Sequence, residues 1–341
     1  MRNYSLPVED IGSILSHTGI LWERLRGGRL FLTGGTGFFG CWLLESFVAA
    51  HDTYGLEAEV VVLTRDPGQF AKKAPHLSAH SAIRLVQGDI IDFPFPAGHF
   101  THIIHAATTS GGPVPNREML DTILLGTRRV LDFAVVSGAE QLLFTSSGAV
   151  YGAQPPERVN LPESFTGVLP ILPSPFSVYG GGKRMAELFC SIAHQETGLQ
   201  AKIARCFAFV GPHLPLDAHF AIGNFIRDGL AGRPIQVQGD GTACRSYLYA
   251  ADLVIWLWTI LLKGEPVHPY NVGSDQGLTI RALAEMVGTI FNVPVTVAQS
   301  SDPNRIPSRM IPDTQRSQIE LGLKIYTSLE DSIRKTAQWY R

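Results

Sequence analysis

The stretch Arg29-Leu30-Phe31-Leu32-Thr33-Gly34-Gly35-Thr36-Gly37-Phe38-Phe39-Gly40 decides how this chain folds. It reads as a short apolar strand, a glycine-rich turn and the start of a helix that continues to Phe47. Gly35, Gly37 and Gly40 fit the pattern G-x-G-x-x-G. In this pattern one glycine permits the tight turn, one lets backbone amides approach a pyrophosphate, and one lets the helix pack against the strand. The helix N-terminus adds free N–H groups and a positive dipole. The stretch therefore predicts a dinucleotide-binding turn.

Short apolar segments that alternate with helices follow this turn. We expect strands at 59–66, 83–90, 102–107, 141–147 and 201–205, and helices at 119–136 and 179–197. Such alternation needs crossover connections, so it predicts an α/β fold with a Rossmann-type, doubly wound parallel sheet. Ligands bind these sheets at the carboxyl ends of the strands. The candidate residues there are Gly34 to Gly40, Thr64-Arg65, Asp89-Ile90, Ala106-Ala107 and Ser146-Ser147.

The domain organisation follows from where this pattern loosens. Beyond about residue 206, proline and glycine become more frequent, as in Gly211-Pro212 and Gly239-Asp240-Gly241. We expect a Rossmann domain at 28–205 with a returning segment near 247–272, and a smaller mixed α/β substrate-binding domain at 206–246 and 273–341. Residues 1–27 form an N-terminal extension, in which 7–27 have the spacing of one amphipathic helix that covers the sheet edge or an oligomer contact.

Composition and charge exclude several classes of function. The 341 residues are 45% hydrophobic, which is ample for a large buried core, and the net charge of -2 comes without long runs of either sign. We therefore expect no nucleic-acid or membrane partner. The four cysteines are scattered and form no C-x-x-C, so we expect no disulfide framework and no metal site, and a cytoplasmic location fits.

The chemical signal lies in Tyr179-Gly180-Gly181-Gly182-Lys183, a Tyr-x-x-x-Lys at the start of a helix. The i, i+4 spacing places both side chains on one helix face. An ammonium near a phenol favours the phenolate, so we expect Lys183 to lower the pKa of Tyr179 from about 10 and make it a usable base. Ser146-Ser147 stands at the end of an upstream strand, and a serine hydroxyl there can hold a substrate oxygen beside the tyrosine.

Together these motifs identify a family. The chain resembles the extended short-chain dehydrogenase/reductase family, in its nucleotide-sugar epimerase/dehydratase branch, from Thr33 to about Gly322. The matching segments are Thr33 to Gly40, Gly88-Asp89-Ile90, His105-Ala106-Ala107, Gly126-Thr127, Ser146 to Gly152, Tyr179 to Lys183, Gly211-Pro212, Gly239 to Thr242 with Arg245, Asn271-Val272-Gly273 and Leu321-Gly322.

The resemblance implies a role for each site residue. Tyr179 is the acid/base, Lys183 tunes it and binds the nicotinamide ribose, and Ser147 bonds the reacting sugar oxygen. Asp89 accepts from the adenine amino group, and Ile90 lies beside the ring. The implied NAD(P) contacts are Gly34, Thr36, Gly37, Phe38, Phe39, Gly40, Thr64, Arg65, Asp89, Ile90, Ala106, Ala107, Tyr179 and Lys183. The implied nucleotide-sugar contacts are Ser147, Asn224, Phe225 and Arg245, with Arg305 or Arg309 as a second diphosphate arginine. The resemblance also implies a homodimer.

The sequence departs from the family pattern at three places. The 4,6-dehydratases carry Asp-Glu after the catalytic hydroxyl residue, where this chain has Gly148 and Ala149, which disfavours a standard 4,6-dehydratase. Thr64 stands where NAD-preferring members carry an acid, and Arg65 could pair with a 2′-phosphate, which slightly favours NADP, although Asp66 is close by. Ala208 and Ile123 replace frequent asparagines near the substrate.

These observations leave three hypotheses for function. The leading one is a nucleotide-diphosphate-sugar 4-epimerase, or a related oxidoreductase, that transfers hydride to and from nicotinamide. The nearest rival is an NADPH-dependent reductase of a 4-keto sugar nucleotide. A non-catalytic nucleotide-binding sensor or scaffold is the rival from another class, and Ser147, Tyr179 and Lys183 argue against it because a scaffold needs none of them.

Overall fold

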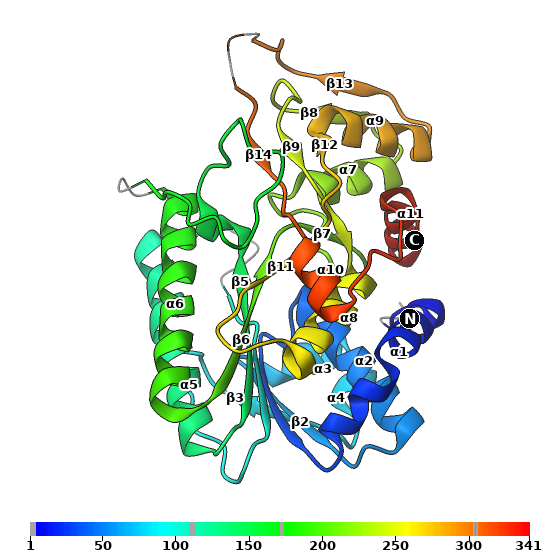
Figure 1. Cartoon of the computed structure of the whole chain (residues 1–341). Coiled ribbons are helices and arrows are strands. Elements are labelled where there is room, and N and C mark those ends of the chain that lie inside the picture. The colour runs from blue at the N-terminus through cyan, green and yellow to red at the C-terminus, as the bar shows by residue number, and fades with distance from the viewer. Residues whose placement is uncertain (1–4, 109–113, 171–173, 303, 305) are drawn as a thin grey trace.

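A computed structural model of the chain describes residues 5–108, 114–170, 174–302, 304 and 306–341. Its centre is a seven-stranded sheet in the order β11-β6-β5-β4-β1-β2-β3, and every neighbouring pair is parallel (Figure 1). The strands are β1 (Arg29–Thr33), β2 (Glu59–Thr64), β3 (Ile83–Gln87), β4 (His102–His105), β5 (Gln141–Ser147), β6 (Gln200–Cys206) and β11 (Tyr270–Val272). The predicted fold class is confirmed.

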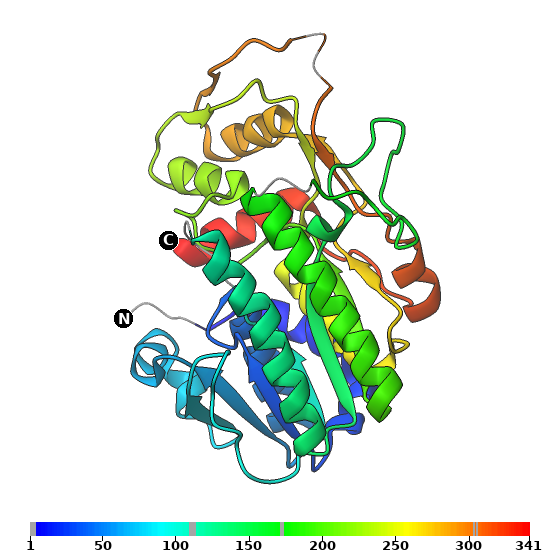
Figure 2. The ribbon, with the colours of Figure 1, turned by 90° about the vertical axis from the view of Figure 1, so that its left-hand side faces the viewer.

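Alternating apolar side chains give this sheet two separate cores. Leu30 and Leu32 of β1 belong to one core, and Phe31 between them belongs to the other, as the two-residue repeat of a strand requires. Both faces are apolar because helices cover both, which is why these strands read as continuous hydrophobic runs. Helices α5 (Asn116–Val136) and α6 (Pro175–Thr197) lie side by side over the second core (Figure 2).

The first core is covered by α2 (Phe38–Tyr54) and α8 (Ala250–Lys263), and α1 (Val8–Thr18) packs on both of these helices. The single helix expected over 7–27 is therefore wrong in length, because the chain changes to a 3₁₀ turn, η1 (Gly19–Leu25), after Thr18. The extension adds a layer over the helices of one face and does not cover a sheet edge. Among the described helices, none is long and apolar enough to cross a membrane.

The remaining elements form a smaller unit, which we call the second lobe. Its sheets are short: β7 (Phe209–Val210) with β10 (Leu248–Tyr249), β12 (Leu278–Thr279) with β9 (Cys244–Arg245) and β14 (Arg309–Met310), and β8 (Ile235–Val237) with β13 (Val295–Val297). Its helices are α7 (Ala221–Leu230), α9 (Ile280–Phe291) and α11 (Leu329–Tyr340), which share one apolar core. Helix α10 (Gln315–Leu321) lies against β11, and α3 (Pro67–Lys73) and α4 (Pro75–Ser78) link β2 to β3. The proposed domain boundaries remain a prediction.

Candidate active site

The glycine turn after β1 has the shape of a phosphate cradle. Gly34 has a φ of +73°, and a Cβ there would lie 2.6 Å from the Ala106 carbonyl carbon and oxygen, so the position accepts only glycine. Helix α2 has 17 residues and begins at Phe38, with Gly37 at its N-cap. Its N-terminal amides and the positive end of its dipole therefore point toward this turn. A pyrophosphate fits this arrangement. The left-handed residue is Gly34, one position before the Gly35 that opens the G-x-G-x-x-G match.

Lys73 is a cradle residue that the sequence did not single out. It belongs to α3, and its Nζ donates to the Thr36 carbonyl at 2.7 Å. A cation is thereby placed beside the turn where phosphate charge would lie. No motif marks this lysine, because its relation to Thr36 exists only through the fold of β2 and α3.

The ends of β2 and β3 carry the predicted ribose and adenine contacts. Thr64 is buried, and Arg65 after it is exposed. Asp66, which the sequence left as a competing residue, caps α3, since its Oδ1 accepts from the Gln69 amide at 2.9 Å. Asp89 follows β3 and accepts from the Ile91 amide at 3.1 Å, while Ile90 is buried in the core of the α5 face.

The end of β4 is held in place by a buried histidine. The Ala107 amide donates to Thr33 Oγ1 at 3.1 Å, so the Thr33 hydroxyl can donate to His105 Nδ1, 2.8 Å away. His105 Nε2 then faces Thr127 Oγ1 at 3.1 Å. Burial lowers the pKa of His105 to about 3, so the ring is neutral. His105 therefore ties β4, with Ala106 and Ala107 at its end, to β1 and α5.

The structure brings the three predicted catalytic residues together at the carboxyl end of β5. Ser147 ends this strand, and its Oγ accepts from the Ala149 amide at 3.1 Å. Lys183 is buried, and its Nζ donates to the Thr145 carbonyl at 2.9 Å and lies 5.8 Å from the centre of the Tyr179 ring. Tyr179 and Lys183 occupy successive turns of α6, which begins with a capping box formed by Ser174 and Ser177.

The ionisation of Tyr179 differs from the sequence-based expectation. Burial raises the pKa of Tyr179 above its usual value of 10, and the hydroxyl groups of Thr108 and Ser147 only partly oppose this effect. Burial also lowers the pKa of Lys183 to about 8. The expected lowering of the Tyr179 pKa is therefore wrong, because desolvation of the phenolate is the largest effect on that pKa.

Two further residues belong to this site, although the sequence analysis missed them. Thr108 lies one position beyond the predicted Ala107, and its buried hydroxyl faces the Tyr179 phenol but makes no hydrogen bond of normal geometry within the described residues. Gly180 lets η2 (Gly148–Tyr151) approach α6, because a Cβ on it would lie 2.4 Å from the Ala149 carbonyl oxygen. The position of Thr108 after a strand could have revealed it, whereas the closeness of Gly180 to Ala149 is a tertiary contact.

The segment after Ser147 carries no acid. Gly148 and Ala149 form a buried 3₁₀ turn with Val150 and Tyr151. Neither residue has a side chain that can donate or accept a proton, so the acid/base pair that the dehydratase pattern requires is missing from this turn. The buried Ile123 of α5 packs in the second core.

Apart from Ser147, the predicted substrate residues that the structure describes lie in the second lobe, in two groups. Arg245 on β9 donates to the Cys244 and Ser308 carbonyls, and Arg309 on the adjacent strand β14 pairs in register with Cys244. The buried Nε of Arg309 has no hydrogen-bond partner within the described part of the chain. The structure thus places both arginines on neighbouring strands. Arg305 lies outside the described residues.

A cavity of about 400 Å³ opens beside Arg309. Arg309, Cys244 and Thr242 are among its lining residues, with Pro156, Thr279, Ile306 and Pro307. The second group, on α7, is less suited to a ligand: Asn224 Oδ1 accepts from Arg227, and the Phe225 side chain is buried in the core of the second lobe. A ligand contact at Phe225 would be made by its backbone.

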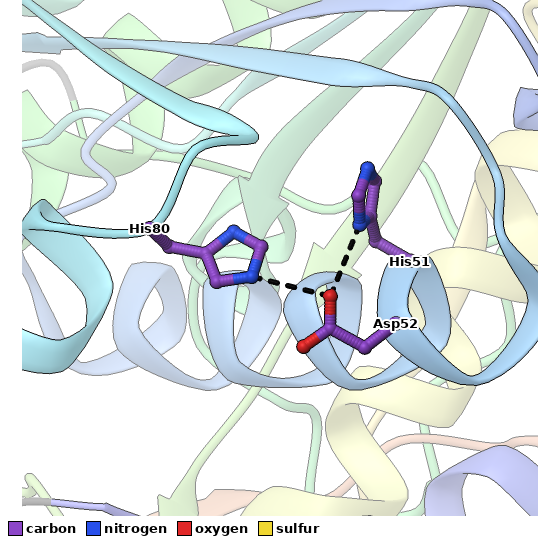
Figure 3. A group of neighbouring side chains, drawn as sticks. All are labelled: His51, Asp52 and His80. Atoms are coloured by element: carbon purple, nitrogen blue, oxygen red, sulfur yellow. Dashed lines mark hydrogen bonds and ion pairs between the residues drawn. The ribbon is translucent and has the colours of Figure 1, made fainter.

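One cluster outside this site has the composition of a metal site. His51, Asp52 and His80 converge at the end of α2, with both rings 3.2 Å from Asp52 Oδ1 (Figure 3). The Ala82 amide, however, donates to His80 Nδ1 at 3.2 Å, so the ring proton sits on Nε2 and points at Asp52. That nitrogen has no lone pair to offer a cation, and the cluster is a set of hydrogen bonds that joins α2 to the turn before β3.

Comparisons with known proteins extend these findings. The model of the NAD dependent epimerase/dehydratase family matches residues 30–273. UDP-glucuronic acid decarboxylase 1 of Arabidopsis thaliana is 28% identical over 324 residues, which cover 95% of this chain and 71% of that protein. The matched family is one of enzymes, which supports the enzymatic interpretation over a scaffold.

Solved structures share the fold. Epimerase Mth375 from Methanothermobacter thermautotrophicus superposes with a TM-score of 0.78 over 96% of each chain, at 20% identity, which shows the fold alone. DesIV, a dTDP-glucose 4,6-dehydratase from Streptomyces venezuelae solved with NAD and TYD bound, is 26% identical, with a TM-score of 0.75 over 92% of this chain and 97% of that one.

The prediction of a nicotinamide cofactor is confirmed, and NAD is the cofactor that the family description names. The expected slight preference for NADP is not supported. The predicted family is confirmed as well, because the matched segment covers most of the sheet and the turn after β1. The chain belongs to the NAD dependent epimerase/dehydratase family.

Proposed function

We propose that this protein is a nucleotide-diphosphate-sugar 4-epimerase. The observation that carries the proposal is the meeting of Tyr179, Lys183 and Ser147 beside the glycine cradle, in a site whose following residues, Gly148 and Ala149, supply no acid. Inverting a hydroxyl carbon needs one proton acceptor, one hydride acceptor and room for the sugar to turn. It does not need a second acid/base pair to expel water.

The residues of the chain divide the work as follows. Tyr179 takes the proton of the sugar hydroxyl, and Ser147 and Thr108 hold the sugar oxygen and the phenolate by hydrogen bonds. Lys183, fixed to the Thr145 carbonyl, offers its charge and the ribose contact. NAD, held by the Gly34–Gly40 turn and by Asp89, would supply the hydride acceptor and a positive ring that favours the phenolate. Burial raises the pKa of Tyr179, and the positive charge of a bound nicotinamide ring would oppose that effect.

The second lobe would hold the nucleotide diphosphate. Arg245 and Arg309 lie on adjacent strands, and a guanidinium fork donates two parallel hydrogen bonds to a phosphate. The unpartnered Nε of Arg309 is a donor that a phosphate oxygen would satisfy. We keep residues 206–246 and 273–341 as the proposed substrate domain on this ground.

A second candidate is decarboxylation of a nucleotide-linked uronic acid, favoured by the 28% identity to the Arabidopsis decarboxylase. Oxidation at C4 would place a ketone β to the C5 carboxylate. The C5–C6 bond then breaks, carbon dioxide leaves, and the electron pair of that bond stays on the sugar as an enolate. The enolate takes up a proton at C5 before hydride returns to C4. This sequence also needs no acid at 148 or 149. A reductase of a 4-keto sugar is a third outcome, distinguished by the release of oxidised cofactor.

The test begins with the ligand released from purified protein, identified by mass spectrometry. The protein is then incubated with UDP- and dTDP-linked hexoses, with UDP-glucuronate and, in the presence of NADPH, with a 4-keto sugar nucleotide, and the products are followed by NMR. A 4-epimer formed without net cofactor turnover supports the proposal. Carbon dioxide release from UDP-glucuronate selects the decarboxylase, and stoichiometric NADPH oxidation with a 4-keto sugar selects the reductase. If nicotinamide-loaded protein converted none of these substrates, the epimerase, decarboxylase and reductase hypotheses would all be contradicted.

We also propose a homodimer through α5 and α6. These helices expose large apolar side chains, namely Leu125, Val136, Met185, Leu188 and Ile192. We expect Leu188→Arg to shift the mass measured by light scattering from dimer to monomer. A monomeric native protein would contradict the proposal.

A further inference from the structure

The serine beside Ser147 points to the other face of β5. Phe144 and Ser146 lie on the side covered by α5 and α6, as the alternation along a strand requires. Ser146 Oγ is buried and donates to Glu187 Oε1 at 2.5 Å. Glu187 stands on α6, four residues after Lys183. Strand β5 is therefore held to α6 at two successive helical turns, by Lys183 and by Glu187.

Glu187 is itself held by a partly buried arginine. Arg205 lies on β6 directly opposite Ser146 in the register of the sheet. Its Nε donates to Oε1 at 3.0 Å, and its Nη2 donates to Oε2 at 2.7 Å. The side chains of Arg205 and Glu187 are only 13% and 9% exposed. Burying two charges costs desolvation energy that their attraction often fails to recover, so net stability is a weak reason for this pair to exist.

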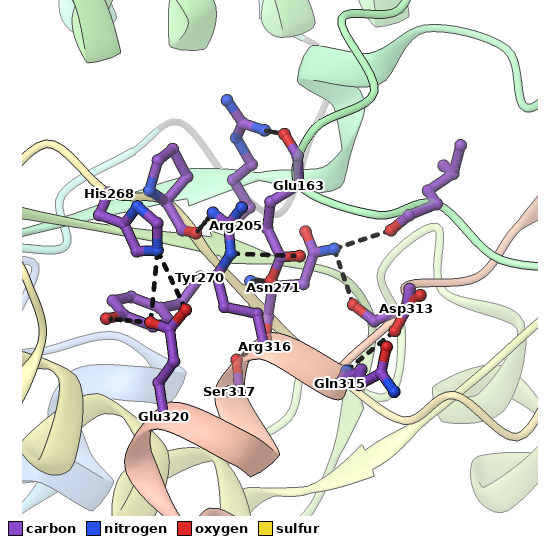
Figure 4. Close-up of polar contacts among 12 residues, drawn as sticks. Glu163, Arg205, His268, Tyr270, Asn271, Asp313, Gln315, Arg316, Ser317 and Glu320 are labelled. Atoms are coloured by element: carbon purple, nitrogen blue, oxygen red, sulfur yellow. Dashed lines mark hydrogen bonds and ion pairs between the residues drawn. The ribbon is translucent and has the colours of Figure 1, made fainter.

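The third nitrogen of the Arg205 guanidinium contacts Tyr151, the last residue of the η2 turn that follows Ser147. Nη1 donates to the Tyr151 hydroxyl at 3.0 Å and to the Glu163 carbonyl at 3.1 Å. The Tyr151 hydroxyl donates in turn to Asn271 Oδ1 at 2.7 Å. Figure 4 shows Glu163 between Arg205 and Asn271: its carbonyl accepts from Arg205 and its Oε1 accepts from the Asn271 amide, while the Asn271 side chain donates to the Asp313 carbonyl. The Glu187–Arg205 ion pair thus contacts the residues on both sides of the segment Ser147–Val150, namely Ser146 before it and Tyr151 after it.

We propose that the buried Glu187–Arg205 pair is a positioning device that fixes helix α6, with Tyr179 and Lys183, against the strand end that carries Ser147. The inference rests on the proposed function of that site. The pair acts through Ser146 and Tyr151 and takes no part in proton or hydride transfer. A displacement of about 1 Å between Tyr179 and Ser147 can cost up to roughly 100-fold in rate, which is the effect that the pair prevents.

The first test uses Ser146→Ala, which removes the hydrogen bond to Glu187 and leaves the ion pair intact, so that folding is preserved. We expect a fall in kcat of about 10- to 100-fold with KM and bound nicotinamide unchanged, and recovery in Ser146→Thr, which restores a hydroxyl. Glu187→Gln keeps an acceptor for Ser146 but unpairs Arg205, and we expect the same fall in kcat together with lower thermal stability.

The matched control is Asp10→Asn. Asp10 is another buried carboxylate, which accepts from the Tyr249 hydroxyl at 2.6 Å and from Lys335 Nζ at 2.7 Å, in the layer formed by α1 and α11. We expect this variant to lose thermal stability and to keep the kcat of the native protein. A fall in kcat as large as that of Glu187→Gln would overturn the proposal, since any lost buried charge would then have the same effect.

A second readout does not depend on turnover. The Ala149 amide donates a hydrogen bond to Ser147 Oγ. Its rate of hydrogen exchange therefore reports how firmly the η2 turn is held. In nicotinamide-loaded protein we expect Ser146→Ala and Glu187→Gln to speed this exchange about tenfold and Asp10→Asn to leave it unchanged. Unchanged exchange in both site variants would overturn the positioning role, even if the native protein acted on none of the sugars tested and the proposed function had failed.

Discussion

The part of the molecule built on the seven-stranded sheet, which we call the sheet lobe, holds its charged groups differently from the second lobe. In the sheet lobe, Lys183 and Glu187 are buried and Arg205 is partly buried, and each is fixed by hydrogen bonds to strands or helices of five residues or more. In the second lobe, Arg245 and Arg309 stand on two-residue strands and contact backbone carbonyls of neighbouring segments. The first arrangement suits chemistry that needs a rigid geometry. The second suits binding of a flexible diphosphate ligand, in which side chains adjust to the partner.

Tyr179→Phe is the substitution that should separate the lobes most sharply. General acid/base catalysis contributes about 10²- to 10⁴-fold, so we expect kcat to fall by that factor while nicotinamide stays bound and KM changes little. Steady-state kinetics with mass spectrometry of the bound cofactor makes the measurement. Tyr326→Phe, in the loop before α11 and partly exposed, is the control and should keep full activity. An active Tyr179→Phe protein would remove Tyr179 from the mechanism.

Arg245→Met tests the second lobe and should act on binding. Loss of charge-assisted hydrogen bonds worth about 1.5–3 kcal/mol predicts a rise in KM of roughly 10- to 150-fold with a small change in kcat. Arg334→Met, on the exposed pair with Glu330 in α11, should leave both constants unchanged. If Arg245→Met lowered kcat alone, the arginine would act on the reacting groups, and the contrast between the two lobes would fail.

Lys183→Met should lower the activity of the protein and raise its stability at pH 7. Burial lowers the pKa of Lys183 from 10.5 to about 8, so below pH 8 the folded protein bears the cost of a buried charge. Between about pH 8 and 10.5 the unfolded chain keeps a proton that the folded chain releases, so native stability rises with pH there. At pH 7 we expect Lys183→Met to unfold with a free energy higher by about 1–3 kcal/mol, the upper figure being the pKa difference in energy.

Urea unfolding of ligand-free Lys183→Met and native protein at pH 7 and at pH 10.5 measures this effect. The advantage of the variant should disappear at the higher pH, where the lysine of the native protein is increasingly neutral in both states. A variant less stable than the native protein at pH 7 would show that the hydrogen bond to the Thr145 carbonyl outweighs the desolvation of the ammonium.

Arg65→Ala should have the smallest effect. Arg65 is exposed at the end of β2, and the family description names NAD as the cofactor. We expect less than about a threefold change in the Kd for NAD, because the guanidinium is an exposed charge of small energetic effect. Fluorescence titration with NAD and with NADP measures both affinities. A large loss of NADP affinity, with tight NADP binding in the native protein, would restore the NADP hypothesis.

The comparison of lobes also explains what could be predicted. The strands, both apolar faces and the residues at strand ends follow from local periodicity. Tyr179 and the pair Ser146-Ser147 could therefore be named from residue types and spacing, and the family resemblance selected Ser147. Thr108 lies one residue beyond the last predicted contact of its strand and could have been found by the same rule. Lys73 and Gly180 could not, because their partners, Thr36 and Ala149, are distant in the sequence. The expected pKa of Tyr179 was wrong because spacing on a helix gives charge proximity and says nothing of burial.

By itself the amino-acid sequence determined the parallel sheet, the phosphate cradle after β1, the pairing of Tyr179 with Lys183, and the family. These depend on periodicity and on residue types a few positions apart, which neighbouring side chains enforce locally. Only the tertiary structure decided that Arg245 and Arg309 share a sheet, that Asp66 caps a helix, and that Glu187 and Arg205 meet beneath Ser147. Those relations arise where strands and helices from distant parts of the chain pack together, and burial then sets which charges pair and which protons are held.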